Sequence, residues 1–208
     1  MARKSKGIPL KKNILIFCEG DTEVLYFEML NQKYKSSTTV RIRPVCRNGK
    51  QGEALIKDLI QQMKTNPVYS PRKYESVYAV FDKDDLPLVD IKRAYELAEK
   101  HDITVIFSNE CFDLWLLKHY KKVTGHSDRS SIYKSLRKEL NLPKEYTKYK
   151  ADKAFIERHF RHAVSQAMQN TQHIDDINAN MAIPSNPYTN IHINLEKIYK
   201  RTNTSSGW

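Results

Sequence analysis

Apolar and polar positions follow two different periods through the first half of the chain. Four short runs of apolar or β-branched residues predict strands, at Ile14–Cys18, Val40–Val45, Val77–Phe81 and Ile103–Phe107. Between them, apolar residues recur every three or four positions, which predicts helices over Thr22–Lys33, Glu53–Lys64 and Asp90–Lys100. The connections are long enough for parallel crossovers. The pattern therefore predicts an α/β fold with an open, mostly parallel four-stranded sheet flanked by helices.

After Phe107 the pattern becomes helical. Phe112, Trp115, Leu116 and His119 fall on one face of a helix. Three later segments also have helical spacing, at Ile132–Leu140, Asp152–Gln169 and Asn190–Lys200. We therefore expect a basic N-terminal arm (1–12), an α/β domain (13–120) and a helical C-terminal extension packed on the same domain (121–208).

Acidic residues follow two of the predicted strands. Glu19 comes directly after the first strand, and Asp82, Asp84 and Asp85 follow the third. In open parallel sheets, ligands bind outside the carboxyl ends of the strands, so these side chains can meet there. Carboxylates gathered at one edge repel each other unless a cation holds them, and hard oxygen ligands suit Mg²⁺ or Mn²⁺. The sequence predicts a metal-dependent enzyme that acts on phosphates.

The charge of the chain is strongly positive and unevenly distributed. The net charge is +11, and the segment from Leu114 to Ala163 contains 13 Lys or Arg against 5 Asp or Glu, a net of +8. Such a surface attracts DNA or RNA, although a basic surface kept for solubility stays possible. The best candidates for contacts with a nucleic-acid backbone are Lys148, Lys150, Lys153, Arg158 and Arg161. The alternative interpretation is that these residues are ordinary surface charges on a helix.

The cysteines and the hydropathy pattern indicate a cytoplasmic protein. Cys18, Cys46 and Cys111 are an odd, widely spaced set that matches neither a zinc site nor a disulfide framework. No apolar stretch approaches the roughly 18 to 20 residues that span a bilayer, and the basic N-terminus lacks the apolar region of a signal peptide. We expect reduced thiols and no membrane association.

Four segments resemble the RloB family, which includes the AbiLii-type abortive infection proteins. They occur in the family's order, at Ile16–Phe27, Val80–Asp85, Ser108–Leu117 and Asn186–Asn190. The resemblance implies a Toprim fold and a Toprim-type metal-dependent nuclease that acts on DNA or RNA, with tRNA among the candidate substrates. It also implies that the protein is the effector of a bacterial antiphage system with a partner ATPase of the ABC or AAA type.

The resemblance also assigns roles to the acidic residues. Glu19 takes the position of the Toprim glutamate, a general acid or base, and Asp82 and Asp84 take those of the metal-binding Asp-x-Asp pair. Asp85 is a ligand, an orienting group or a loop residue, and Glu23 and Asp113 are candidates for a second cation. The chain departs from the family pattern, which often has Glu at Asp113, Pro at Glu110 and Ser at Tyr188.

Other interpretations of these residues remain open. Glu19 can instead be an acidic residue that interacts favourably with the dipole at the N-terminus of the following helix. An Asx turn before Pro87 explains one of the aspartates. A catalytically silent scaffold that binds nucleic acid or an ATPase is the main alternative function. A strand-end phosphotransfer protein is less favoured, because such proteins place an Asp after the first strand. The Asn48–Gly52 segment does not match a P-loop, so any ATP dependence is expected to come from a partner.

Overall fold

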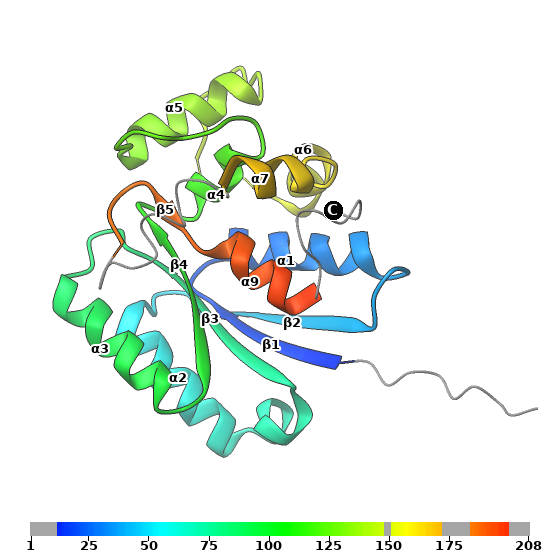
Figure 1. Ribbon diagram of the computed structural model, residues 1–208, viewed down its shortest axis with the longest axis vertical. Coiled ribbons are helices and arrows are strands. Elements are labelled where there is room, and N and C mark those ends of the chain that lie inside the picture. The colour runs from blue at the N-terminus through cyan, green and yellow to red at the C-terminus, as the bar shows by residue number, and fades with distance from the viewer. Residues whose placement is uncertain (1–11, 148–150, 172–183, 200–208) are drawn as a thin grey trace, which may run out of the picture.

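The strands form one sheet in the computed structural model, which describes residues 12–147, 151–171 and 184–199. Within these residues the sheet has five strands in the order β2-β1-β3-β4-β5 (Figure 1). The first four are parallel neighbours and the last is antiparallel to β4. Their bounds are β1 Lys12–Cys18, β2 Val40–Cys46, β3 Ser76–Asp82, β4 Ile103–Asn109 and β5 Tyr188–Thr189.

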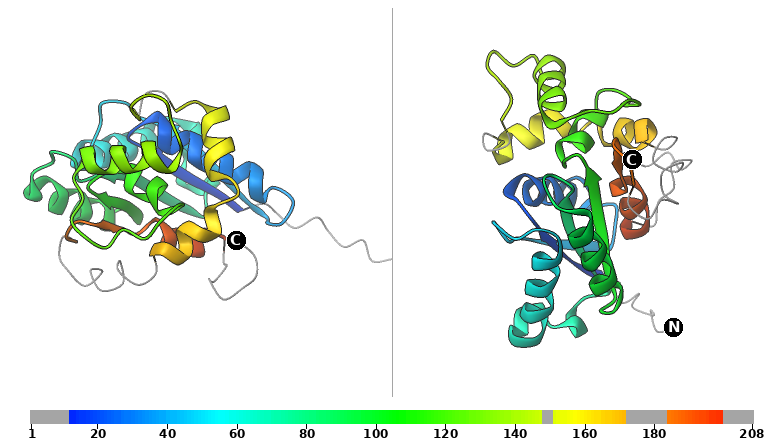
Figure 2. Two further views of the ribbon diagram at one scale, coloured as in Figure 1. Left: turned by 90° about the horizontal axis from the view of Figure 1, so that it is seen from above. Right: turned by 90° about the vertical axis from the view of Figure 1, so that its left-hand side faces the viewer.

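Helices cover both faces of the sheet. One face carries α2 and α3, while α1, α4, α6, α7 and α9 lie on the other, and α5 lies beyond the carboxyl end of β4 (Figures 1 and 2). The helix bounds are α1 Asp21–Tyr34, α2 Gly52–Thr65, α3 Leu88–Glu99, α4 Asp113–Lys118, α5 Arg129–Glu139, α6 Lys153–Phe160, α7 Val164–Thr171 and α9 Ile191–Tyr199. Two short 3₁₀ helices, η1 Pro67–Tyr69 and η2 Pro71–Lys73, lie between α2 and β3.

The period of two along the central strands builds both cores. In β1, Leu15 and Phe17 pack in the cluster that α2 and α3 cover, whereas Ile14, Ile16 and Cys18 pack in the opposite cluster. Successive side chains of a strand point to opposite faces, so a parallel strand covered on both faces is apolar throughout. These continuous apolar runs are why the sequence pattern located β1 and β3.

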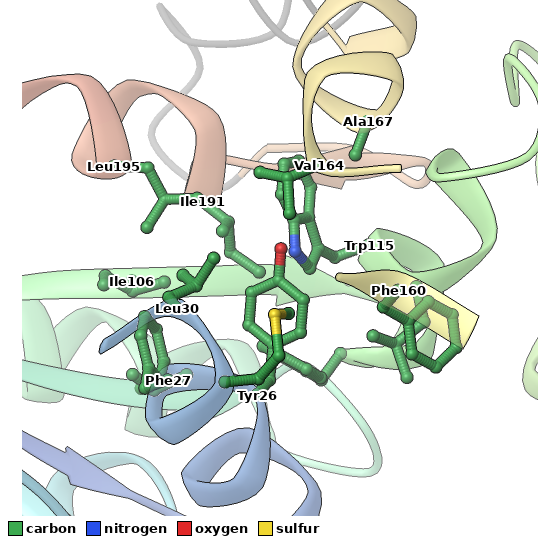
Figure 3. Packing of buried hydrophobic residues seen from close by; sticks show 14 of the residues in the cluster. Tyr26, Phe27, Leu30, Ile106, Trp115, Phe160, Val164, Ala167, Ile191 and Leu195 are labelled. Atoms are coloured by element: carbon green, nitrogen blue, oxygen red, sulfur yellow. The ribbon is translucent and has the colours of Figure 1, made fainter. Parts of the chain in front are cut away.

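The larger core has aromatic side chains at its centre. Tyr26 and Trp115 make an edge-to-face contact with ring centroids 6.2 Å apart, and Phe160, Val164 and Ile191 close the cluster from three further helices (Figure 3). This packing brings α6, α7 and α9 against α1 and α4. The later helices therefore share the core of the α/β domain.

Strand β2 forms an edge of the sheet and is blocked by a side chain. Ile42 donates its N–H to Asn31 Oδ1 at 2.8 Å, and its carbonyl accepts a hydrogen bond from Asn31 Nδ2 at 2.6 Å. Pro44, two residues on, has no N–H to offer. Because Asn31 occupies groups that another strand would pair with, it protects this edge.

We expect Asn31→Ala to lower the free energy of unfolding by about 1–2 kcal/mol, because two hydrogen bonds to the backbone of Ile42 are lost. Urea unfolding of this variant and the wild type measures the change. Gln32→Ala, at an exposed position of the same helix, is the control and should change stability little. An Asn31→Ala protein as stable as the control would contradict the protective role.

Two features of the C-terminal extension differ from the prediction. The sheet has a fifth strand, so the prediction of four strands was wrong and the extension is not wholly helical. Tyr188–Thr189 pairs with Ser108 and Asn109, and Asn190 fixes the junction because it bonds the N–H of Phe107 at 2.8 Å and the carbonyl of Val105 at 3.1 Å. A strand of two residues is too short to produce a periodic pattern.

The segment predicted as one helix over Asp152–Gln169 is two helices, α6 and α7. Side chains from other parts of the protein donate hydrogen bonds to backbone carbonyls near the break between α6 and α7. Lys33 Nζ donates to the carbonyl of Arg161 at 2.8 Å, and the Tyr120 hydroxyl donates to that of His159 at 2.6 Å. These contacts come from distant residues, so the apolar spacing could not reveal the break. In the described part of the chain, no helix is both long and apolar enough to cross a membrane.

Candidate active site at the carboxyl edge of the sheet

A cavity of about 490 Å³ opens at the carboxyl ends of the parallel strands. The β1–α1 turn contributes Glu19, the β3–α3 loop contributes Asp84 and Asp85, and the loop before α2 contributes Gln51. From beyond the sheet, α5 contributes Arg129 and Tyr133. A larger cavity of about 730 Å³ lies against β2, but Glu28 is its one acidic lining residue within the described part of the chain. The smaller cavity is therefore the candidate site.

Glu19 is held by the backbone and by two hydrogen bonds to its carboxylate. Its N–H donates to the carbonyl of Val80 at 3.1 Å, which continues the pairing of β1 with β3. Gln51 Nε2 donates to Oε1 at 2.6 Å, and the backbone N–H of Asp82 donates to Oε2 at 3.3 Å. The carboxylate thus lies beside the end of β3, as the sequence predicted.

The aspartates after β3 divide between the interior and the cavity. Asp82 ends the strand and is 1% exposed, whereas Asp84 and Asp85 line the cavity. Asp84 has a φ of +37°, in the left-handed direction that Asp tolerates better than most residues. Its N–H donates to the carbonyl of Glu110 at 3.1 Å. This turn sets Asp84 over the cavity.

An arginine from α5 completes the site. Arg129 Nη2 forms an ion pair with Asp84 Oδ1. Arg129 is the first residue of α5, which Asp128 caps by accepting the N–H of Ser131 at 2.7 Å. The sequence analysis did not find Arg129, because nothing in the chain links it to residues so far before it.

The loop before α2 approaches the aspartate loop closely. Gly52 has a φ of +47°, and a Cβ at this position would lie 3.2 Å from Leu86 Cδ1. Glycine is therefore favoured both by the backbone conformation and by the space available. The close approach keeps Gln51, another residue that the sequence analysis missed, against Glu19. Its position in the loop between the Asn48–Gly49 turn and the predicted helix was the available signal; in the structure it is the N-cap residue of α2.

Glu23 and Asp113, the candidates for a second cation, do not line the cavity. Asp113 is fully buried and accepts a hydrogen bond from the Tyr146 hydroxyl at 2.6 Å. Burial raises the pKa of Tyr146 well above its usual value, and the charge of Asp113 raises it further, so the hydroxyl stays a donor. Glu23 is 1% exposed. Burial raises the pKa of the Cys18 thiol, and the charge of Glu23 raises it further. Glu23 therefore lies near Cys18, the last residue of β1.

The basic candidates lie on α6, at the residue directly after it, or outside the described residues. Lys148 and Lys150 fall in the part that the structure does not describe. Lys153, the first residue of α6, is exposed and lies two positions after Ala151, which lines the cavity. Arg158 is exposed, whereas Arg161 is half-buried and pairs with Glu157 at 2.8 Å. Lys153 is thus the described candidate with the clearest connection to the site.

The donor chemistry of the site fits a hard divalent cation. The acidic side chains at the end of the sheet offer carboxylate oxygens, the ligand type that Mg²⁺ and Mn²⁺ prefer. The type of donor fits but the arrangement does not yet: among the residues that the structure describes, no three His, Cys, Asp or Glu side chains are grouped as a metal site. Arg129 supplies the positive charge beside Asp84. A cation and Arg129 would therefore compete for the negative charge of Asp84.

Comparison with known proteins gives one positive result. The model of a family described as RloB-like protein matches residues 14–198, a range that begins within β1 and ends within α9. No curated protein and no solved structure matches the chain.

Proposed function

We propose that this chain, which belongs to the RloB-like protein family, is a metal-dependent nuclease that hydrolyses phosphodiester bonds in DNA or RNA. The observation that carries the proposal is the shared cavity of Glu19 and Asp84, which follow different strands and meet at the carboxyl edge of a parallel sheet. Sites in open α/β sheets occur at this edge. This position of Glu19 and Asp84 supports the Toprim-type roles that the sequence resemblance implies for them.

The residues divide the chemistry between them. Glu19 is the general acid or base, and it moves a proton to or from the attacking or leaving oxygen. Gln51 orients Glu19 through the 2.6 Å hydrogen bond. Asp84 and Asp85, which line the cavity, and the buried Asp82 at the end of β3 would hold Mg²⁺ or Mn²⁺, which when bound polarises the scissile phosphate and stabilises its transition-state charge.

The cellular role that we propose follows from the family resemblance. The nuclease is the effector of a bacterial antiphage system and acts with a partner ATPase of the ABC or AAA type. The net charge of +11 supports a polyanionic substrate, because basic surfaces attract nucleic acids. Lys153 and Arg158 are exposed on α6 and are available for backbone contacts.

One observation favours a second candidate, a catalytically silent scaffold that binds nucleic acid. The carboxylate of Asp84 is already neutralised by Arg129, and the described side chains do not form a finished metal centre. In this alternative, the ion pair has a structural role and joins α5 to the β3–α3 loop.

Titration of Mn²⁺ into the purified protein, followed by calorimetry, separates the two functions. We expect the wild type to bind Mn²⁺ and the Asp82→Asn/Asp84→Asn variant to lose at least about tenfold in affinity, because two charged ligands become neutral. The control is Asp90→Asn/Asp102→Asn, which removes two negative charges at α3 and the turn after it. Equal binding by all three proteins would contradict the proposed site, and no binding by any of them would favour the scaffold.

A further inference from the structure

Arg129, the basic residue of the candidate site, has N–H donors that contacts within the described part of the protein do not occupy. Among the described residues that line the cavity, Arg129 is the only basic one. Its side chain is 40% exposed and its Nη2 contacts Asp84, while its Nε is buried and has no hydrogen-bond partner within the described part of the chain. A guanidinium has five N–H donors in a fixed plane, so Arg129 retains donors for a ligand.

We infer that Arg129 binds a backbone phosphate of the nucleic acid. Without ligands its guanidinium is paired with Asp84, and it becomes available when a cation binds Asp84 or when the phosphate displaces Asp84. The inference rests on the proposed function for its substrate class. It adds a phosphate-binding residue to the site and a coupling between the binding of metal and of nucleic acid.

Electrostatics gives the first reason. A phosphodiester that enters the cavity meets the negative charges of Glu19, Asp84 and Asp85, and repulsion at these distances is strong where water is excluded. A positive group beside these carboxylates, as Arg129 is beside Asp84, offsets that repulsion. Arginine suits this position because its planar donor pair matches two oxygens of a phosphate.

The way in which Arg129 is positioned gives the second reason. The residues before it are fixed by Asn186, which donates to the carbonyl of Ser127 and accepts its N–H, both at 2.9 Å. Asp128 then caps α5. The start of the helix is therefore tied to the segment next to β5, and the guanidinium is directed to the cavity before any ligand arrives. A prepared donor loses less conformational entropy when it binds.

The ion pair gives the third reason and the coupling. While Asp84 is ionised and free of metal, its charge cancels that of Arg129. A cation that takes Asp84 releases the guanidinium for phosphate, so each ligand should strengthen binding of the other, as reciprocal linkage requires.

Binding of a short fluorescein-labelled single-stranded oligonucleotide in EDTA, measured by anisotropy, tests the inference without metal or cleavage. Asp84→Asn should tighten binding about tenfold, because a charged donor is released to the phosphate. Arg129→Gln introduced into that variant should remove most of the gain. Asp85→Asn is the matched control, since it removes the same charge from the same cavity without freeing Arg129, and Arg129→Gln should have a smaller effect in its background.

Arg129→Lys supplies a second readout in the Asp84→Asn background. It keeps one positive charge but not the planar donor pair, so it should recover part of the affinity that Arg129→Gln loses. The slope of log affinity against log salt should fall by about one for Arg129→Gln and be retained by Arg129→Lys.

Two results would overturn the inference. One is a gain in Asp84→Asn that survives Arg129→Gln, which would show a general charge effect; the other is the absence of oligonucleotide binding by Asp84→Asn at low salt. Failure of the proposed function is distinguishable from both. If the protein neither binds Mn²⁺ nor cleaves nucleic acid, but its oligonucleotide binding still depends on Arg129, the site binds nucleic acid in a protein without catalytic activity.

Discussion

Glu19→Gln is expected to reduce phosphodiester cleavage by about 100-fold or more, because loss of a general acid or base typically costs a factor of 10²–10⁴. Glutamine has nearly the same shape, and its side-chain oxygen still accepts the N–H of Asp82 that now bonds Glu19 Oε2. The fold should therefore persist while proton transfer is lost. Cleavage of labelled DNA and RNA in the presence of Mn²⁺ is the direct measurement.

A nuclease that its partner keeps inactive would show no cleavage when purified alone. The same comparison is therefore made in cells, where toxicity on overexpression together with the proposed partner ATPase reports activity. Glu28→Gln provides the matched control, since it makes the same change on α1 at a residue outside the candidate cavity. Full cleavage and toxicity in Glu19→Gln would contradict its catalytic role.

Acidification from about pH 7 to pH 5 is expected to destabilise the protein by about 2 kcal/mol through His119 alone. Burial lowers the pKa of His119 to about 3 from its ordinary value of 6.5, an effect that hydrogen bonds to backbone carbonyls only partly oppose. The ring lies in the core with its Nε2 3.1 Å from the Tyr26 hydroxyl and its Nδ1 3.0 Å from the carbonyl of Trp115. It is neutral in the folded protein.

The direction of the effect follows from proton uptake. Below pH 6.5 the unfolded chain binds a proton at His119 and the folded protein does not, so stability is fully present above this pH and declines as the pH falls toward 3. His192 behaves in the same way, because burial and then the charge of Lys118 lower its pKa to about 4. Together the two residues should cost about 4 kcal/mol at pH 5.

Urea unfolding at several pH values between 7 and 5 measures this dependence. His119→Gln removes one of the two groups, so the loss of stability over this range should fall by about half, whatever the variant's stability at pH 7. His101→Gln is the control, because His101 is exposed in the turn after α3. A His119→Gln protein with the wild-type dependence on pH would show that His119 does not titrate as its burial requires.

The sequence alone determined the parts of the fold that rest on local periodicity. The strands β1 and β3 are apolar on both faces, and the helices α1, α2 and α3 carry regular apolar spacing, so each is recognisable without its neighbours. The positions of Glu19 and Asp84 followed from the same information. Glu19 comes directly after β1 and Asp84 two residues after the end of β3, and the carboxyl ends of parallel strands lie at one edge of a sheet.

Tertiary contacts decided what the periodicity could not. The two-residue strand β5 depends on pairing with β4. The helices α6 and α7 separate where Lys33 and Tyr120 donate hydrogen bonds to backbone carbonyls. Likewise, the hydroxyl that bonds Asp113 comes from Tyr146, 33 positions later. A carboxylate after a strand could therefore be recognised as a candidate, but the pattern could not show which carboxylates reach the cavity.

The sequence by itself fixed the α/β class, the parallel strands and the edge at which acidic side chains gather, because spacing along the chain dictates which faces are buried. Only the tertiary structure placed Gln51 on Glu19 and Arg129 on Asp84, across 32 and 45 positions. Such contacts leave no trace in local spacing, since their energy depends on distances that exist only after the two loops and α5 have packed together.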